Sequence, residues 1–335
     1  MKKTLAAAAL SLSFFSASAA IAPKLVIVAM FAPEAKLWLE RLGPWQATKV
    51  PGLSPDYPTV QCNRQQVCVM TTGMGHSNAA ASTMALAFSP AFDLRRSYVL
   101  VAGIAGINPE LGTLGSVAWA RYLVDYGIQW EIDAREIPAT WPSGLLGINT
   151  KHPGEKPPLD YRTEVFQLDE ALLQKALALS RQVPLSDGAQ AQAARAHFPS
   201  APANQPPTVL QCDTLAGDTW FSGTRLSERA SEWTRILTDG QGQYCTTQQE
   251  DNATYEALKR GAAAGRVDLK RVAVLRAGAD FDRPYPGQSS ADNLLGYAAQ
   301  GGFDISLENL YRAGLPLVQA ITSAWPAWRA GVPAR

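Results

Sequence analysis

The sequence of 335 residues lacks the features that mark several large classes of protein. Beyond its first twenty residues no segment approaches 18 consecutive apolar residues, so we expect no transmembrane helix and no membrane insertion of the mature chain. It has no basic stripe and no block of like charge, which argues against nucleic acid and anionic membrane as partners. Its three histidines show no ligand spacing relative to the cysteines, so we expect neither a metal site nor a cofactor.

The one apolar run of note stands at the amino terminus. Lys2 and Lys3 precede a mostly apolar stretch over residues 5–15, and the small residues Ala-Ser-Ala follow it. A basic start, a short apolar segment and a small-residue cleavage site are typical of a secretory signal peptide. The stretch is too short to span a membrane as an anchor. The pattern therefore predicts a periplasmic or secreted protein.

The expected cleavage near Ala19/Ala20 divides the chain into a signal peptide, residues 1–19, and a mature part, residues 20–335. Loss of two lysines would leave 28 basic and 29 acidic residues, a net charge near −1. The mature length is sufficient for one large core, and we expect a single domain. Two segments rich in Pro, Gly and Ala are expected to be irregular insertions: 138–161 and 183–207.

The four cysteines of an exported chain are expected to form disulfides, for which three connectivities exist. Two β-rich runs flank a polar turn around Gln65, and a three-residue loop there would place Cys62 opposite Cys68. This favours the pair Cys62–Cys68 and leaves Cys212–Cys245 by elimination. Buried free thiols are the alternative, disfavoured in an oxidising compartment.

Apolar strands alternate with helical patterns along the mature chain. Continuous apolar runs predict buried strands at 23–30 and 97–107, the stretch 271–284 begins as a further buried strand and ends with two aspartates, and residues 115–127 suggest one long strand. A last helical stretch is expected over about 306–328, interrupted at Pro316. Strands covered on both faces by helices imply an α/β layered fold.

Glycines or acids follow four of the expected strands. In α/β sheets, ligands bind beyond the carboxyl ends of the strands. One glycine cluster would more often be a tight turn, but several at one edge of a sheet make a pocket there the better interpretation. The four segments are 31–34, 71–78, 102–108 and 277–282.

Three stretches, "TTGMGHSNAAAS", "VLVAGIAGINPELGTLGSVAWARYLVDYGIQWEIDARE" and "LRAGADFDRP", closely resemble the purine nucleoside permease family. That family in turn resembles the nucleoside phosphorylase and nucleosidase superfamily. The resemblance covers nearly the whole mature chain. It implies a three-layer α/β/α fold around a mixed, partly barrel-like sheet, and a purine nucleoside as the ligand. The family name implies nucleoside transport.

The resemblance gives Asp280, after the strand "RVAVLRAGAD", the role of the acid that protonates or hydrogen-bonds purine N7. Such a role requires a carboxyl whose pKa is raised by burial. The alternative for Asp280 is a turn residue that caps the next segment. Asp282, beside Arg283 and Pro284, fits a surface ion pair in a loop.

The resemblance also implies the residues that would contact the sugar and the base. Glu250, in "QQED", would bind the ribose 2′- and 3′-hydroxyls, although an acid that serves the start of a helix is nearly as good an interpretation. Trp220 would stack on the base, although a Trp at the end of a strand is more often part of the core. Backbone and small residues of the glycine-rich segments would approach the ligand closely: Gly75, Ile104, Ala105 and Gly106.

The chain departs from the phosphorylases where phosphate would bind. Val101 and Ile104 stand in place of an arginine and a serine, and Glu34 falls near a second arginine position. A phosphate dianion would be repelled there, whereas Glu34 matches the glutamate that activates water in nucleosidases. The alternative interpretation of Glu34 is an ordinary acidic residue in the first turn of a helix. Two functions stay open, nucleoside binding in uptake and hydrolysis of the N-glycosidic bond, as does a homo-oligomeric state.

Overall fold

Two strands of ten residues form the centre of the fold: β5 (Tyr98–Ile107) and β14 (Val272–Phe281). The computed structural model describes residues 19–334, and in it these strands pair in parallel over almost their full length. Every residue of β14 is buried, as is every residue of β5 except Ile104. Because helices cover both faces, the two strands are mostly apolar along their length rather than alternating, and β14 buries Arg276 and Asp280 as well.

Within residues 19–334 the large sheet has twelve strands, and its main path runs β10-β7-β12-β13-β5-β1-β4-β3-β2. Off this path, β14 pairs with β5 and β6, and β6 pairs with β11. The sheet is mixed, because β1 runs parallel to β4 and β5 whereas β13 runs antiparallel to β5. The bounds are β1 (Leu25–Ala29), β2 (Trp45–Lys49), β3 (Thr59–Asn63), β4 (Val67–Thr71), β6 (Val117–Trp119), β7 (Tyr122–Asp125), β10 (Val165–Gln167), β11 (Val209–Gln211), β12 (Asp213–Ala216) and β13 (Tyr244–Gln248).

The sheet curls where strands exchange partners. The first half of β5 lies between β1 and β14, whereas its last residues pair with β13 as well as β14. Since β14 also pairs with β6, the sheet bends back on itself and is partly barrel-like.

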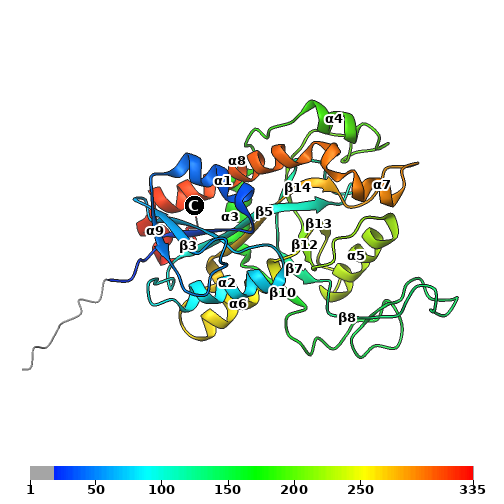
Figure 1. The fold of residues 1–335 in the computed structure, drawn as a ribbon, viewed down its shortest axis with the longest axis horizontal. Helices are drawn as coiled ribbons and strands as arrows, with labels where there is room; N and C mark the ends of the chain where they lie inside the picture. Colours follow the sequence, from blue (N-terminus) through cyan, green and yellow to red (C-terminus); the bar gives the residue numbers. More distant parts are fainter. Residues whose placement is uncertain (1–18, 335) are drawn as a thin grey trace, which may run out of the picture.

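Helices form the two outer layers of the fold (Figure 1). On one face, Trp38 and Leu310 share a hydrophobic cluster with the central strands, and on the other Leu86 and Leu258 do so. The first face carries α1 (Ala32–Leu42), α3 (Glu170–Ser180) and α8 (Gly302–Ser323), and the second carries α2 (His76–Phe88) and α6 (Asp251–Ala263). A further helix, α5 (Thr224–Leu237), packs Trp233 against β7 and β12. The expected three-layer α/β/α arrangement is confirmed.

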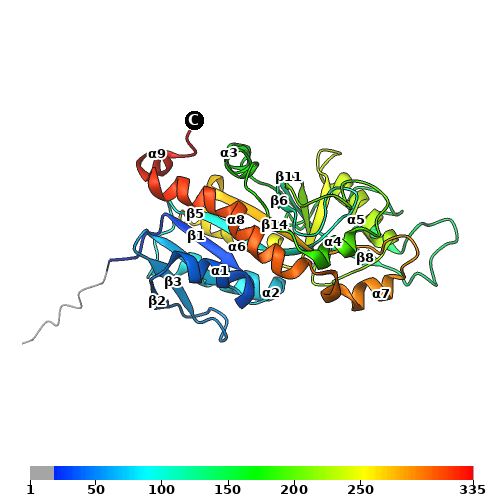
Figure 2. The same cartoon turned by 90° about the horizontal axis from the view of Figure 1, so that it is seen from above.

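The remaining elements lie around this frame. Figure 2 shows α4 and α7 at the end of the molecule opposite to α9. The segments expected to be irregular each contain a short element, β9 in the first and α4 in the second. The bounds are β8 (Gln129–Glu131), β9 (Leu145–Gly147), α4 (Ala189–Arg195), η1 (Leu269–Arg271), α7 (Ser290–Leu295), η2 (Tyr297–Gln300) and α9 (Trp325–Ala330).

Two local predictions are wrong. Residues 115–127 do not form one strand, because the chain changes partners between β6, which pairs with β14 and β11, and β7, which pairs with β12 and β10. The final helix is not interrupted at Pro316, since α8 continues to Ser323. Leu317, Val318 and Ile321 are buried against the sheet, and this burial holds the helix together beyond the proline.

The parallel strands β1, β4, β5 and β14 bring their carboxyl ends to the same edge of the sheet. The segments that follow them therefore meet, as expected. Among residues 19–334, the structure has no helix that combines the length and the apolar character needed to cross a membrane. The expected signal peptide falls, apart from Ala19, on residues 1–18, which lie outside the described part of the chain.

Candidate functional site

A pocket of about 620 Å³ opens at the carboxyl edge of the sheet. One part of its wall is apolar, formed by Met30, Phe31, Met74, Leu294, Tyr297 and Phe303. The other part is polar and charged, formed by Glu34, Gln248, Gln249, Glu250, Arg276 and Asp280. Ile104, Ala105, Ala279 and Trp220 complete the lining. A concave, mostly apolar cavity with a few convergent charged groups is typical of a small-molecule site.

Glu34 lies in the first turn of α1, directly after β1, and is buried. Its carboxylate accepts hydrogen bonds from the backbone N–H of Met30 and of Ile104, each at 2.7 Å. It thereby ties the end of β1 to β5. Burial raises the pKa of Glu34 to about 7, against the opposing influence of the nearby Arg276 guanidinium and of these bonds. A carboxyl with this pKa can take up or release a proton near neutral pH.

Glu250 occupies the N-cap position of α6 and is also buried. Its Oε1 accepts a hydrogen bond from the Gly75 backbone N–H at 2.9 Å, and Arg276 Nη2 lies 3.4 Å from its Oε2. Gly75 is not among the residues that line the pocket, and its N–H holds Glu250. The backbone of Gly75 has φ +88°, which a glycine adopts without strain.

Arg276 is the cation of the site, and it was recognised in the sequence only as part of a motif. Its side chain is 1% exposed and pairs with the fully buried carboxylate of Asp251 at 2.6 Å. Gly103, on the neighbouring strand, leaves the space that this arrangement needs. A Cβ atom at Gly103 would collide with Arg276 Nη1 and lie 2.6 Å from Glu34 Oε1. The glycine therefore permits the approach of guanidinium and carboxylate.

Asp280 stands near the end of β14, opposite Gly106 of β5, where the pairing register shifts. Its side chain is buried and lines the pocket. Burial, and to a smaller extent the negative charge of Asp282, together raise the pKa of Asp280 to about 7. The environment that an acid needs to hold a proton near neutral pH is therefore present.

Asp282 is not the surface residue that its neighbours in the sequence suggest. Its side chain is fully buried, and it accepts hydrogen bonds from the hydroxyls of Ser227 and Tyr244. The prediction of a surface ion pair in a loop is wrong because α5 and β13 cover the end of β14. Arg283 is buried as well and reaches the exposed Glu110 at 2.8 Å.

Trp220 lies at the pocket and is 36% exposed, so part of its indole is open to a ligand. Ile104 and Ala105, from the glycine-rich segment, line the pocket. Gly106 does not. A Cβ atom there would lie 3.5 Å from the Trp220 ring, so Gly106 packs against the indole rather than lining the cavity. Sequence reasoning missed Gln248 and the apolar wall, for which only the folded chain gives evidence.

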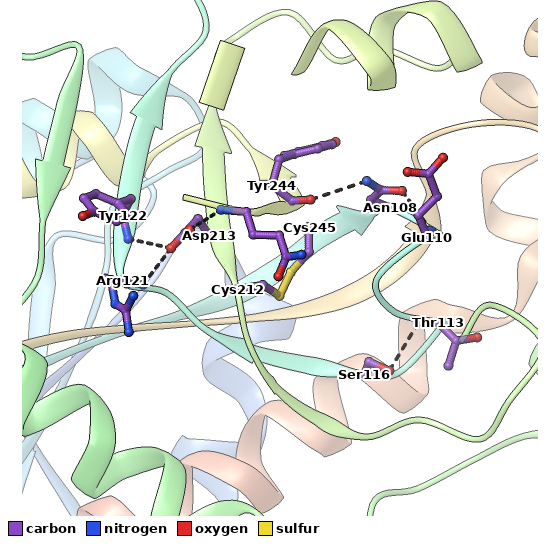
Figure 3. The surroundings of a disulfide bond; sticks show 11 residues. Asn108, Glu110, Thr113, Ser116, Arg121, Tyr122, Cys212, Asp213, Tyr244 and Cys245 are labelled. Atoms are coloured by element: carbon purple, nitrogen blue, oxygen red, sulfur yellow. Dashed lines mark hydrogen bonds between the residues drawn. A yellow bond between two sulfur atoms is a disulfide. The ribbon is translucent and has the colours of Figure 1, made fainter. Parts of the chain in front are cut away.

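A disulfide lies at the amino ends of two strands that lead to the site. Cys212 is bonded to Cys245, and in the hairpin of β3 and β4 Cys62 is bonded to Cys68. Both pairings are the expected ones. Figure 3 shows Asp213, the neighbour of Cys212, accepting hydrogen bonds from backbone N–H groups, including that of Tyr122 at 2.7 Å. The Cys212–Cys245 disulfide and the Asp213 carboxylate together fix β7, β12 and β13 relative to one another.

The chain has the fold of the nucleoside phosphorylases and nucleosidases, with a pocket at the carboxyl edge of its sheet. The 5′-methylthioadenosine/S-adenosylhomocysteine nucleosidase of Helicobacter pylori superposes with a TM-score of 0.55, at 13% identity over 90% of this chain and 98% of that one. The corresponding nucleosidase of Neisseria meningitidis gives 0.54 at 12% identity, covering 89% and 99%. Futalosine hydrolase of H. pylori gives 0.53 at 13%, covering 87% and 97%. Likeness at such identities concerns the fold alone.

The chain belongs to the purine nucleoside permease family, whose sequence profile matches residues 22–333. A protein of Schizosaccharomyces pombe described as a probable purine nucleoside permease is 39% identical over 320 residues, 91% of each chain. The purine nucleoside permease of Candida albicans is 37% identical over 308 residues, 90% of this chain and 76% of that protein.

Proposed function

We propose that the pocket binds a purine nucleoside and that the chain takes part in nucleoside uptake. The observation that carries the proposal is the convergence of Glu34, Glu250 and Asp280 on one apolar pocket beside the partly open Trp220 indole. Family membership supports it, because the relatives are named purine nucleoside permeases.

Each part of a nucleoside has a suitable partner in this pocket. The Trp220 indole offers a flat apolar surface for the base. A protonated Asp280 donates a hydrogen bond to an acceptor nitrogen such as N7. Glu250 Oε1 accepts from the Gly75 N–H at 2.9 Å, and Oε2 accepts only through the longer contacts with the Gln249 N–H at 3.3 Å and with Arg276 Nη2 at 3.4 Å. A carboxylate has about four acceptor sites, so one ribose hydroxyl would take the remaining site and the other would replace one of the long Oε2 contacts.

A second candidate function, hydrolysis of the N-glycosidic bond, is favoured by the raised pKa of both Glu34 and Asp280. Ionised Glu34 would accept a proton from a water molecule while the oxygen of that water forms a bond to the ribose C1′. The C1′–N9 bond would break with its electron pair moving to the purine, and Asp280 would deliver its proton to N7. The products are ribose and the free base.

Phosphorolysis is disfavoured by the charge of the pocket. The pocket lining carries three carboxyl groups, those of Glu34, Glu250 and Asp280, but a single guanidinium, and Arg276 is already paired with the buried Asp251. A phosphate dianion would approach three carboxyl groups without a free cation among the lining residues to hold it.

We place the chain in the periplasm or outside the cell, after cleavage near Ala19/Ala20. The amino-terminal sequence pattern and the two disulfides support this location. Amino-terminal sequencing of the native protein tests it, and a mature chain that retains Lys2 and Lys3 contradicts it.

The function is tested by incubating the purified mature chain with inosine, adenosine and guanosine, with and without phosphate. Calorimetry measures binding, and chromatography measures release of the base. Binding without release supports the binding function, whereas release that does not depend on phosphate supports hydrolysis. Glu34→Gln should then bind but not hydrolyse, and Glu40→Gln, on the exposed side of the same helix, is the matched control. Failure to bind any purine nucleoside overturns the proposal.

A further inference from the structure

Asp282 lies two residues beyond Asp280 and is surrounded by hydrogen-bond donors. Its Oδ2 accepts from Ser227 Oγ on α5 and from the Tyr244 hydroxyl on β13, the latter at 2.6 Å. Arg283 Nε lies 3.5 Å from its Oδ1. The backbone of Asp282 is fixed on both sides, since its N–H donates to Ile107 and its carbonyl accepts from Gly223.

The direction of the Ser227 hydroxyl proton follows from its other partner. Arg283 donates to Ser227 Oγ from Nε at 3.0 Å and from Nη2 at 2.6 Å. A guanidinium has no acceptor, so the single proton of Ser227 must point to Asp282 Oδ2. A neutral Asp282 would carry its proton either on Oδ1, which is buried and has no hydrogen-bond partner in residues 19–334, or on Oδ2, where the Tyr244 hydroxyl would have to become the acceptor. These contacts favour the ionised form of Asp282.

Asp280 has the opposite surroundings. Within residues 19–334 no side chain or backbone group donates a hydrogen bond to its carboxyl, although the group is buried. Two neighbouring buried carboxyls disfavour a second negative charge, and the one with donors keeps the charge. The pKa values agree in order, since burial raises that of Asp280 to about 7 and that of Asp282, which its hydrogen bonds lower again, to about 6.

Other charged groups face the two carboxyls from neighbouring elements. Glu34 on α1, Glu250 at the start of α6 and Arg276 on β14 line the same pocket as Asp280. Glu110, after β5, lies behind Arg283 at the surface. Their charges act on both carboxyls, whereas Ser227 and Tyr244 donate hydrogen bonds to Asp282 and none to Asp280.

We propose that Asp282 is a positioning residue, which remains ionised so that the proton of the pair stays on Asp280, facing the pocket. The location of the proton is a property of the free protein. Its consequence for a ligand rests on the proposed function: the pocket selects purines that offer an acceptor at N7, and it discriminates against 7-deazapurines.

The test is a titration of the free protein labelled with ¹³C at the aspartate carboxyl carbon. The Asp282 carbon should titrate at lower pH than the Asp280 carbon, each assigned by its Asp→Asn variant. In Asp282→Asn, the pKa of Asp280 should fall by about one pH unit, a tenfold loss of its protonated fraction at alkaline pH. Glu110→Gln, which leaves the pair intact, should change neither titration. An unchanged Asp280 titration in folded Asp282→Asn, or the reverse order in wild type, overturns the proposal.

Tyr244→Phe keeps the inference testable if Asp282→Asn does not fold. Loss of one donor should bring the two titrations closer together, and unchanged titrations contradict the proposal. Inosine affinity at pH 8 should fall about tenfold in Asp282→Asn, in proportion to the lost protonated form. Binding of 7-deazainosine should be unaffected by the variant. If the carbons titrate as proposed but no nucleoside binds, the proposed function fails while the role of Asp282 stands.

Discussion

Replacing Glu250 by glutamine tests the assignment of the sugar contact. The two side chains have the same shape, but glutamine has one acceptor oxygen and one donor nitrogen and carries no charge. In the structure, Glu250 Oε1 accepts from the Gly75 N–H at 2.9 Å, and Oε2 faces Arg276 Nη2 at 3.4 Å. Whichever way the amide turns, its nitrogen faces a donor, so the geometry that would hold the ribose is lost.

The magnitude follows from the kind of hydrogen bond that is removed. Bonds between ribose hydroxyls and a carboxylate are charge-assisted, and their loss should cost about 1.5–3 kcal/mol of binding free energy. This corresponds to roughly a 10- to 150-fold rise in the Kd of inosine. Hypoxanthine has no ribose, so its Kd should change little.

Calorimetric titration of the Glu250→Gln variant with inosine and with hypoxanthine provides the measurement. The exposed Glu40→Gln serves as control for the chemistry of the substitution, and urea unfolding shows whether the loss of a partner for the buried Arg276 lowers stability. Equal losses of affinity for nucleoside and base would refute the reasoning, because they would mean that Glu250 does not contact the sugar.

Three further changes test the structure around the site. Gly103→Ala should lower the free energy of unfolding, measured in urea, by about 1–3 kcal/mol, since the added methyl group collides with the buried Arg276 guanidinium and Glu34 carboxylate. Gly188→Ala, whose Cβ would make ordinary contacts, is the control. Equal stability of the two variants would contradict the packing argument. The free energy of unfolding should fall as pH rises from about 4 to 7, because the pKa of Asp280 is about 7 in the folded state against an ordinary 3.8, so the native state binds the extra proton. Asp280→Asn should flatten this dependence on pH. A stability difference between variant and wild type that does not change with pH would exclude this contribution of Asp280. Replacing Cys212 and Cys245 by alanine should cost about 4 kcal/mol in the chain-entropy account, against about 2 for the disulfide of the short hairpin, and the opposite ranking in urea would count against that account.

The strands around the pocket could be predicted because a strand that is buried on both faces has a mostly apolar local sequence. Runs such as 97–107 and 272–281 are mostly apolar, and parallel pairing then requires their carboxyl ends to meet at one edge. Asp280 could be placed at that edge for the same reason. The hairpin disulfide was equally local, since a three-residue loop sets Cys62 opposite Cys68.

Contacts between residues that are far apart in the sequence could not be predicted, because no local pattern indicates them. Asp282 looks like a loop residue beside Arg283, and only the packing of α5 and β13 makes it buried and supplies Ser227 and Tyr244 as donors. The continuation of α8 through Pro316 likewise depends on the sheet against which the helix packs.

The sequence by itself determined the α/β architecture, the edge at which a ligand would bind, the pairing of the cysteines and the acids of the pocket, because each depends on periodicity, spacing or a recognisable motif. Only the tertiary structure decided the partners of those acids. Arg276 meets Asp251 across 25 positions and Glu34 meets Ile104 across 70, and the charge states of the carboxyls depend on these meetings. Burial and electrostatic interaction act between neighbours in space, and a pattern of letters along the chain does not specify which neighbours those will be.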